Sequence, residues 1–160
     1  MKTIIAFLTF FALGCHPLVT ATDTLSGNGL EVDTTSKLRV VVENPSPDAE
    51  KLGLTRERIE ARVNQILRKA GITPAAKEDL EVGDRFLYVN INVGSPSFSV
   101  TIQFERRVFY QVGNRSVTKI GTTWHGGSTG THGGKRDFIL DGLAGHIEIF
   151  CNEFLKANGK

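Results

Sequence analysis

The chain has 160 residues, of which 40% are hydrophobic, and its 19 basic and 17 acidic side chains give a formal net charge of +2. This length suits one domain with a modest core. Binding to nucleic acid through phosphates needs concentrated positive charge. The near balance of charges excludes that class, so we expect no nucleic-acid partner.

The amino end predicts export. Lys2 precedes the apolar run IIAFLTFFALG, residues 4–14. A helix that crosses a bilayer needs about 20 apolar residues, so this run is too short to span a membrane, but it has the length of the apolar region of a signal peptide. Val19 and Ala21 stand at the small-residue positions that a signal peptidase reads. Cleavage after Ala21 gives a signal peptide of residues 1–21.

A second interpretation of the same region stays open. The tetrapeptide ALGC resembles the bacterial lipobox, whose cysteine becomes the lipidated first residue of the mature chain. Cys15 would then carry lipid, and the signal peptide would be residues 1–14. Both interpretations predict an exported protein, either periplasmic or secreted. Only the second predicts a lipoprotein, and Cys15 is then its only expected contact with a membrane.

A polar segment follows the apolar run. Residues 22–37 read TDTLSGNGLEVDTTSK and are rich in Ser, Thr and Gly. This composition is typical of a flexible leader. Neither an internal repeat nor a second change of composition follows it. The sequence therefore predicts a single domain over residues 38–160.

The domain is predicted to begin with a strand and a helix. Residues 38–43, LRVVVE, are β-branched and end at an Asn-Pro-Ser-Pro turn, which predicts a strand. Thr55 then provides an N-cap and Gly71 a C′ residue for one helix. Between them, apolar side chains recur at helical spacing. They are Ile59, Val63, Ile66, Leu67 and Ala70.

The period of the apolar pattern then changes from 3.6 to 2. Residues 86–93, FLYVNINV, and 98–104, FSVTIQF, alternate apolar and polar side chains, which predicts a hairpin with one covered face. Arg106 falls in phase with the covered set. This indicates either a β-bulge or a sheet that extends beyond its helices, with the arginine serving an interface or the fold. Residues 117–124 are predicted as the last strand.

A final helix is expected from Asp137, as its cap, to about Ala157. Gly142 and Gly145 lie off its apolar stripe and weaken it. The order of elements is then β-α-β-β-β-α. It predicts an α+β two-layer sandwich in which two helices cover one face of a mainly antiparallel four-stranded sheet.

Residues 122–134, TTWHGGSTGTHGG, run from the end of the last predicted strand to just before this helix and are predicted to form a loop. Loops presented by a rigid scaffold often carry function, so this segment is the candidate binding loop. Its candidate binding residues are Trp124, His125, Ser128, Thr129, Thr131, His132, Lys135 and Arg136.

Two chemistries fit the loop in part. Glycines can direct successive amides toward an anion, and Lys135 and Arg136 add positive charge beside a helix start. Ser128, His132 and Asp137 are the groups of a hydrolytic triad. However, no G-x-S-x-G elbow frames the serine, so no catalytic residue is assigned.

A metal site is not expected. His125 and His132 are seven residues apart, which matches no ligand spacing, and no cysteine or HExxH pattern supports them. We therefore expect neither a metal nor a cofactor.

These observations favour an exported, non-catalytic accessory or interaction protein of the bacterial envelope. Its partner would be another protein or an envelope component, bound through the loop, a sheet edge or a hairpin tip. The alternative is a small hydrolase or an anion- or phosphate-binding protein that uses residues 125–136. The sequence does not determine the oligomeric state.

Overall fold

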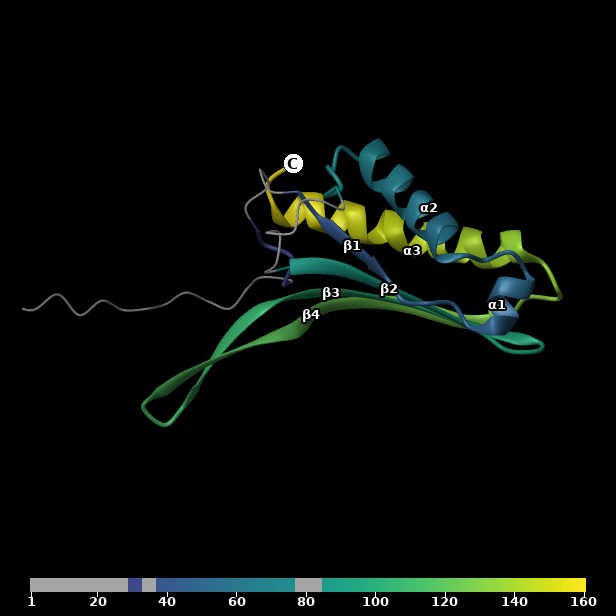
Figure 1. The fold of residues 1–160 in the computed structure, drawn as a ribbon. Helices are drawn as coiled ribbons and strands as arrows, with labels where there is room; N and C mark the ends of the chain where they lie inside the picture. Colours follow the sequence, from purple (N-terminus) through teal and green to yellow (C-terminus); the bar gives the residue numbers. More distant parts are fainter. Residues whose placement is uncertain (1–28, 33–36, 77–84) are drawn as a thin grey trace, which may run out of the picture.

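The computed structural model describes residues 29–32, 37–76 and 85–160. In these ranges a four-stranded sheet carries its helices on one face (Figure 1). The fold is α+β. The predicted signal peptide and Cys15 lie outside the described residues. The elements in chain order are β1 (Arg39–Val42), α1 (Pro47–Lys51), α2 (Arg56–Lys69), β2 (Arg85–Val93), β3 (Ser97–Val112), β4 (Arg115–Thr131) and α3 (Arg136–Ala157).

The sheet is mixed, with strand order β1-β2-β3-β4. β1 pairs parallel with β2, whereas β2 with β3 and β3 with β4 pair antiparallel. The predicted mainly antiparallel sheet is thus shown only in part, because one of its three strand pairs is parallel. The physical reason is the connection: α1 and α2 carry the chain back along the sheet, so β2 runs in the same direction as β1.

The two segments with strong periodicity form as predicted. Thr55 caps α2, its side-chain oxygen accepting a hydrogen bond from the Arg58 amide at 3.3 Å. In β2 and β3 the alternate apolar side chains face the helices. The core side chains of these three elements are Ile59, Val63, Ile66, Leu67, Leu87, Val89, Ile91, Val93, Phe98, Val100, Ile102 and Phe104. This layer of side chains joins the sheet to α2 and α3.

The predicted loop at residues 122–134 is wrong over most of its length. β4 continues to Thr131 and remains paired with β3 throughout. Aromatic rings explain how so glycine-rich a segment forms a strand. A Cβ atom at Gly126 would lie 2.9 Å from the Trp124 ring, and one at Gly130 would lie 2.9 Å from the Phe98 ring. The two rings occupy the space that side chains would otherwise fill and cover the glycine backbone.

Helix α3 begins at Arg136, one residue before the predicted start. Its N-cap is Lys135, which makes no side-chain capping bond, so Asp137 is not the cap. Cβ atoms at Gly142 and Gly145 would meet nothing within 4 Å. In the described part of the chain, neither glycine is therefore explained by a close neighbour.

The packed structure includes part of the segment that the sequence assigned to the leader. Leu30 is fully buried in the core. The Asn158 amide, beyond the end of α3, donates to the Leu30 carbonyl at 3.0 Å, and its oxygen accepts from the Val32 amide at 2.8 Å. The chain around Leu30 is thus fixed to the C-terminal end of α3.

Candidate functional site

The structure separates the predicted site residues into three groups. Trp124 points toward the helices, as its packing against Phe150 shows. His125, Thr129 and Thr131 lie on the opposite face of β4, in register with polar residues of β3. Ser128 shares the helix-facing side of β4 with Trp124. The remaining candidates lie beyond the strand: His132 in the turn after it, Lys135 at the cap of α3 and Arg136 in its first turn.

Trp124 fastens β4 to α3. Its ring packs at 5.2 Å, in an edge arrangement, against Phe150. Its Nε1 donates a hydrogen bond to Glu153 Oε2 at 2.6 Å. Both ends of the side chain therefore make contacts within the fold, and Trp124 has a structural role.

His132 is also held by the fold. Its Nδ1 accepts a hydrogen bond from the Gly134 amide at 3.0 Å, which places the ring proton on Nε2. Nε2 then donates to the Gly94 carbonyl at 3.0 Å. The imidazole thus ties the turn before α3 to the turn between β2 and β3, and both nitrogens are occupied.

Replacing His132 with alanine is expected to lower the free energy of unfolding by about 1–2 kcal/mol, because two hydrogen bonds are removed. His125→Ala is the matched control. That exposed histidine lies on the strand face and should change stability by less than about 0.5 kcal/mol. Urea denaturation followed by circular dichroism measures both. Equal losses in the two variants would contradict this role for His132.

The hydrolytic arrangement is not assembled within the described residues. Asp137 accepts from Arg136 Nε at 3.0 Å, and both His132 nitrogens bond to backbone groups. Within the described residues, no hydrogen bond joins Ser128 to His132 or to Asp137. Ser128 consequently lacks the adjacent base that would activate a serine nucleophile.

A groove lies over the paired strands at the outer edge of the sheet. Its volume is about 410 Å³, and Gly127 is among the residues that line it. A Cβ atom at Gly127 would lie only 2.2 Å from the Val100 carbonyl oxygen, so no other residue fits there without moving the strand. The lining residues are Ser99, Val100, Thr101, His125, Gly126, Gly127, Ser128 and Thr129.

The pattern of hydrogen bonds along β4 follows from the turn that ends it. The His132 amide donates to the Pro96 carbonyl at 3.0 Å, in register with the Ser97–Thr131 pair. In an antiparallel ladder, residue pairs that exchange hydrogen bonds alternate with pairs that do not. Ser97 and Thr131 therefore form a pair that does not.

The same alternation shows which residues of β4 direct their backbone groups toward β3 and which direct them away from it. Ser128 and Gly130 direct their backbone groups toward β3. His125, Thr129 and Thr131 direct their amides and carbonyls away from β3, at the outer margin of the sheet. We call Thr122–Thr131 the edge segment. Among the described residues, no further strand pairs with it.

The remaining cleft lies between α2 and α3 and has a volume of about 360 Å³. Cys151 lines it but is only 2% exposed. Burial, and secondly the negative charge of Glu148, raises the pKa of this thiol from 9.0 to about 11. At neutral pH the thiol is protonated, so it is a poor nucleophile and fits a core position.

The raised pKa predicts a pH dependence of stability. The folded state holds the Cys151 proton more tightly than the unfolded state, so this contribution is complete below pH 9 and is lost as the pH rises toward about 11. The difference in unfolding free energy between the parent protein and Cys151→Ala should shrink over that interval. A constant difference in urea titrations across it would contradict the assignment.

The sequence indicated a hairpin tip among the contact surfaces but not the extent of the hairpin. Beyond the helices, β3 and β4 continue as a two-stranded ribbon that projects from the body (Figure 1). We call Arg106–Gly121 the hairpin arm. A shift of register between Phe104 and Glu105 marks its base. The signal that could have revealed it is the strand-forming run VFYQV, residues 108–112, which follows the charged residues 105–107 and has no apolar alternation that would indicate a helical cover.

At the base of the arm, Arg106 has a structural partner. Its Nη1 donates to the Glu31 carbonyl at 2.7 Å. Two residues before Glu31, the Gly29 carbonyl accepts a second hydrogen bond, from the Thr123 hydroxyl of β4 at 2.7 Å. The residue left over by the register shift is Thr123 of β4, while β3 stays in register with β2 through Arg106. The bulge therefore does not re-aim the arginine, and the extension of the sheet beyond its helices explains its position.

Within the described residues, no three His, Cys, Asp or Glu side chains gather as metal ligands, and no helix is long and apolar enough to cross a membrane. The geometry thus presents two features, the edge segment and the hairpin arm. Comparison with known proteins adds no further candidate: no family model matches the chain, and neither a curated protein nor a solved structure is significantly similar to it.

Proposed function

We propose that this is an exported, non-catalytic interaction protein of the bacterial envelope, and that it binds an extended segment of a partner protein along β4. The observation that carries the proposal is the edge segment, an outer strand with backbone groups directed outward. Main-chain hydrogen bonds to an added strand would supply affinity in this mode of recognition.

The composition of the edge segment supports strand addition. Its sequence, TTWHGGSTGT, contains no Lys, Arg, Asp, Glu or Pro. Edge strands are usually protected from pairing by such residues, or by a covering element. An exposed outer strand without them is a template for another strand.

The groove beside the edge segment supplies a place for a side chain of the partner. Gly127 lines it, between His125 and Thr129 on the same face of β4. An added strand directs every second side chain to that face. The groove would therefore select the size of one partner residue, while hydroxyl groups beside it favour a polar or small one.

Site-specific photocrosslinking tests the proposal in the cell envelope. A benzophenone amino acid at Thr131 should give a discrete adduct with a partner. Thr129→Pro should abolish the adduct, because proline removes an outward amide without removing a bond to β3. Thr129→Val is the matched control and should keep the adduct, because the backbone is unchanged.

Two results would oppose strand addition. The first is an adduct that persists in a folded Thr129→Pro variant. The second is an equal adduct from a benzophenone at Asn92, which is exposed in the inner strand β2. Thermal stabilisation by phosphate that Ser128→Ala removes would instead favour an anion-binding function.

Export is tested separately by mass spectrometry of the amino terminus of the protein isolated from its cells. A chain that begins at Thr22 or at a lipidated Cys15 supports export and identifies which form is present. A chain that retains residues 1–14 would contradict it.

A further inference from the structure

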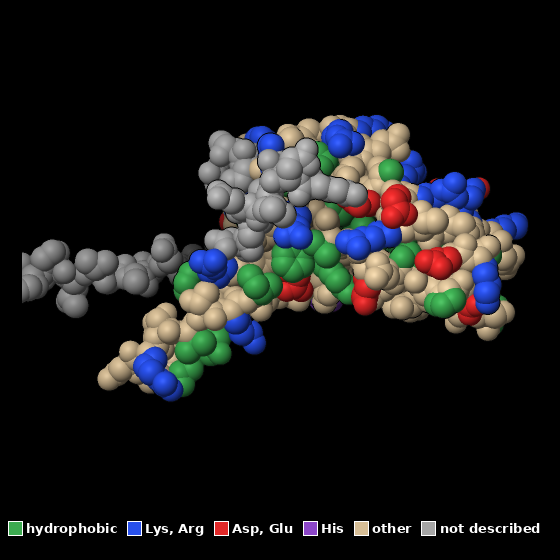
Figure 2. Space-filling model, in the orientation of Figure 1, with side chains coloured by type: hydrophobic (Ala, Val, Ile, Leu, Met, Phe, Trp, Pro, Cys, Tyr) green, Lys and Arg blue, Asp and Glu red, His purple; other side chains and the backbone are tan. Residues whose placement is uncertain are grey.

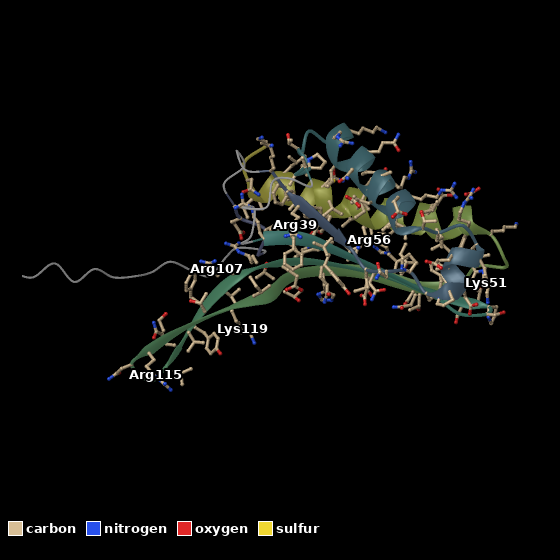
Figure 3. All side chains as sticks on the ribbon, in the orientation of Figure 1. Arg39, Lys51, Arg56, Arg107, Arg115 and Lys119 are labelled. Atoms are coloured by element: carbon tan, nitrogen blue, oxygen red, sulfur yellow. The ribbon has the colours of Figure 1, made fainter. Side chains whose placement is uncertain are left out.

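The hairpin arm differs from the rest of the molecule in charge. Arg106–Gly121 contains four basic residues and no acidic residue, whereas the whole chain has a net charge of only +2. The rest of the chain is therefore slightly acidic. Figure 3 shows Arg107, Arg115 and Lys119 spaced along the projecting ribbon. The molecule concentrates positive charge on the element that extends farthest from its body.

The arm also carries most of the exposed large apolar side chains among the described residues. Phe109 is 68% exposed, Tyr110 and Val112 are each 46%, and Ile120 is 43%. Phe109 and Ile120 share one face of the ribbon, while Tyr110 and Val112 share the other. Figure 2 shows hydrophobic and basic side chains side by side along the arm.

We infer that the hairpin arm docks on an anionic lipid surface and inserts its outer half into the headgroup region. The inference is independent of strand addition at the edge segment. It adds a membrane contact to the one that the sequence suggested, which was a lipid at Cys15. The arm would reach about 20 Å from its base to its tip, given a strand rise of about 3.3 Å per residue.

The distribution of side chains favours a membrane over a protein partner. A protein that packs against one face of a two-stranded ribbon leaves the other face in water. Here Phe109 on one face and Tyr110 on the other are both exposed to water. Insertion of the tip into a bilayer interface surrounds both faces at once. Aromatic rings are well suited to that region, because it is apolar on one side and wet on the other.

The positive charge of the arm argues against a second copy of this chain as the occupant and favours an anionic membrane. Two arms of this protein would bring eight basic residues together, which opposes self-association through the arm. Anionic headgroups neutralise these cations, and the aliphatic stems of Arg115 and Lys119 can lie along the apolar surface. The turn itself is compact: Gly113, with φ of 60°, occupies the position where a type II′ hairpin turn favours glycine.

Quenching of tryptophan emission by brominated lipids tests the inference on the full chain. Phe109→Trp places an indole on the arm, and Ile149→Trp places one at a similarly exposed apolar position of α3. With phosphatidylglycerol vesicles that carry brominated acyl chains, we expect quenching of the Phe109→Trp variant beyond that of the parent protein. The Ile149→Trp control and neutral phosphatidylcholine vesicles should show none.

Charge substitutions complete the test. Arg115→Gln combined with Lys119→Gln should weaken the Phe109→Trp response at least tenfold, as should high salt. Arg56→Gln combined with Lys69→Gln, on exposed positions of α2, should leave it unchanged. The inference is overturned if the indole on the arm is no more quenched than the parent, or if both positions are quenched equally. Thr129→Pro should not alter the response, which separates this contact from the proposed strand addition.

Discussion

Phe150→Ala is expected to lower the free energy of unfolding by about 3–5 kcal/mol, the range typical of a buried phenylalanine truncated to alanine. Phe150 is fully buried and stands at the centre of the aromatic cluster. Its ring centroid lies 5.2 Å from Trp124, 5.4 Å from Phe154 and 5.9 Å from Phe104. The substitution therefore opens a cavity where β3, β4 and α3 meet.

Urea denaturation monitored by circular dichroism measures this loss. Phe109→Ala is the control, since it removes the same number of atoms from an exposed position on the hairpin arm. That variant should differ from the parent by less than about 0.5 kcal/mol. A loss below about 1 kcal/mol for Phe150→Ala would mean that the helices do not pack on the sheet as described.

Gly127→Ala is the second substitution with a large expected effect, a loss of about 2 kcal/mol or more. The added methyl group would lie 2.2 Å from the Val100 carbonyl oxygen. That oxygen belongs to the backbone of β3, so relief requires the two strands to move apart. The paired region of β4 should be weakened as a result.

Gly145→Ala is the matched glycine control. Its added methyl group would meet nothing within 4 Å, and alanine favours a helix over glycine by about 1 kcal/mol. This variant should therefore be more stable than the parent, by up to that amount. If both alanine variants were equally destabilised in thermal unfolding, the close approach of β3 and β4 at Gly127 would be disproved.

The elements that could be predicted from the sequence are those whose apolar period is strong. Helix α2 has both caps and a regular stripe, and β2 with the first half of β3 alternates without interruption. Helix α1 was missed because Asn-Pro-Ser-Pro was interpreted only as the end of a strand. Ser46 and Pro47 are nevertheless a helix start, and the Ser46 hydroxyl accepts from the Ala49 amide.

The second half of β4 could not be predicted, because its stability comes from neighbours rather than from its own residues. Glycine has a low preference for strands, and the rings of Trp124 and Phe98 that cover Gly126 and Gly130 become visible only in three dimensions. Burial of Leu30 is equally a matter of tertiary contacts. A single leucine in a polar segment carries no periodic signal.

The candidate site predicted from the sequence was expected to be a loop, whereas most of it is a strand. A loop would use side chains such as His132 to bind a ligand, whereas the structure commits that side chain to two backbone groups. The strand instead exposes backbone amides and carbonyls that can form hydrogen bonds to a partner. The extent of the hairpin arm was not predicted because it depends on how far β3 and β4 remain paired.

Amide hydrogen exchange, resolved by residue in the isolated protein, tests whether the edge segment is unpaired. We expect slow exchange at Ser128 and Gly130, whose amides bond to β3, and fast exchange at Thr129 and Thr131, whose amides point outward. Equally slow exchange at all four residues would show that the edge is already paired within the chain, and would contradict its availability to a partner.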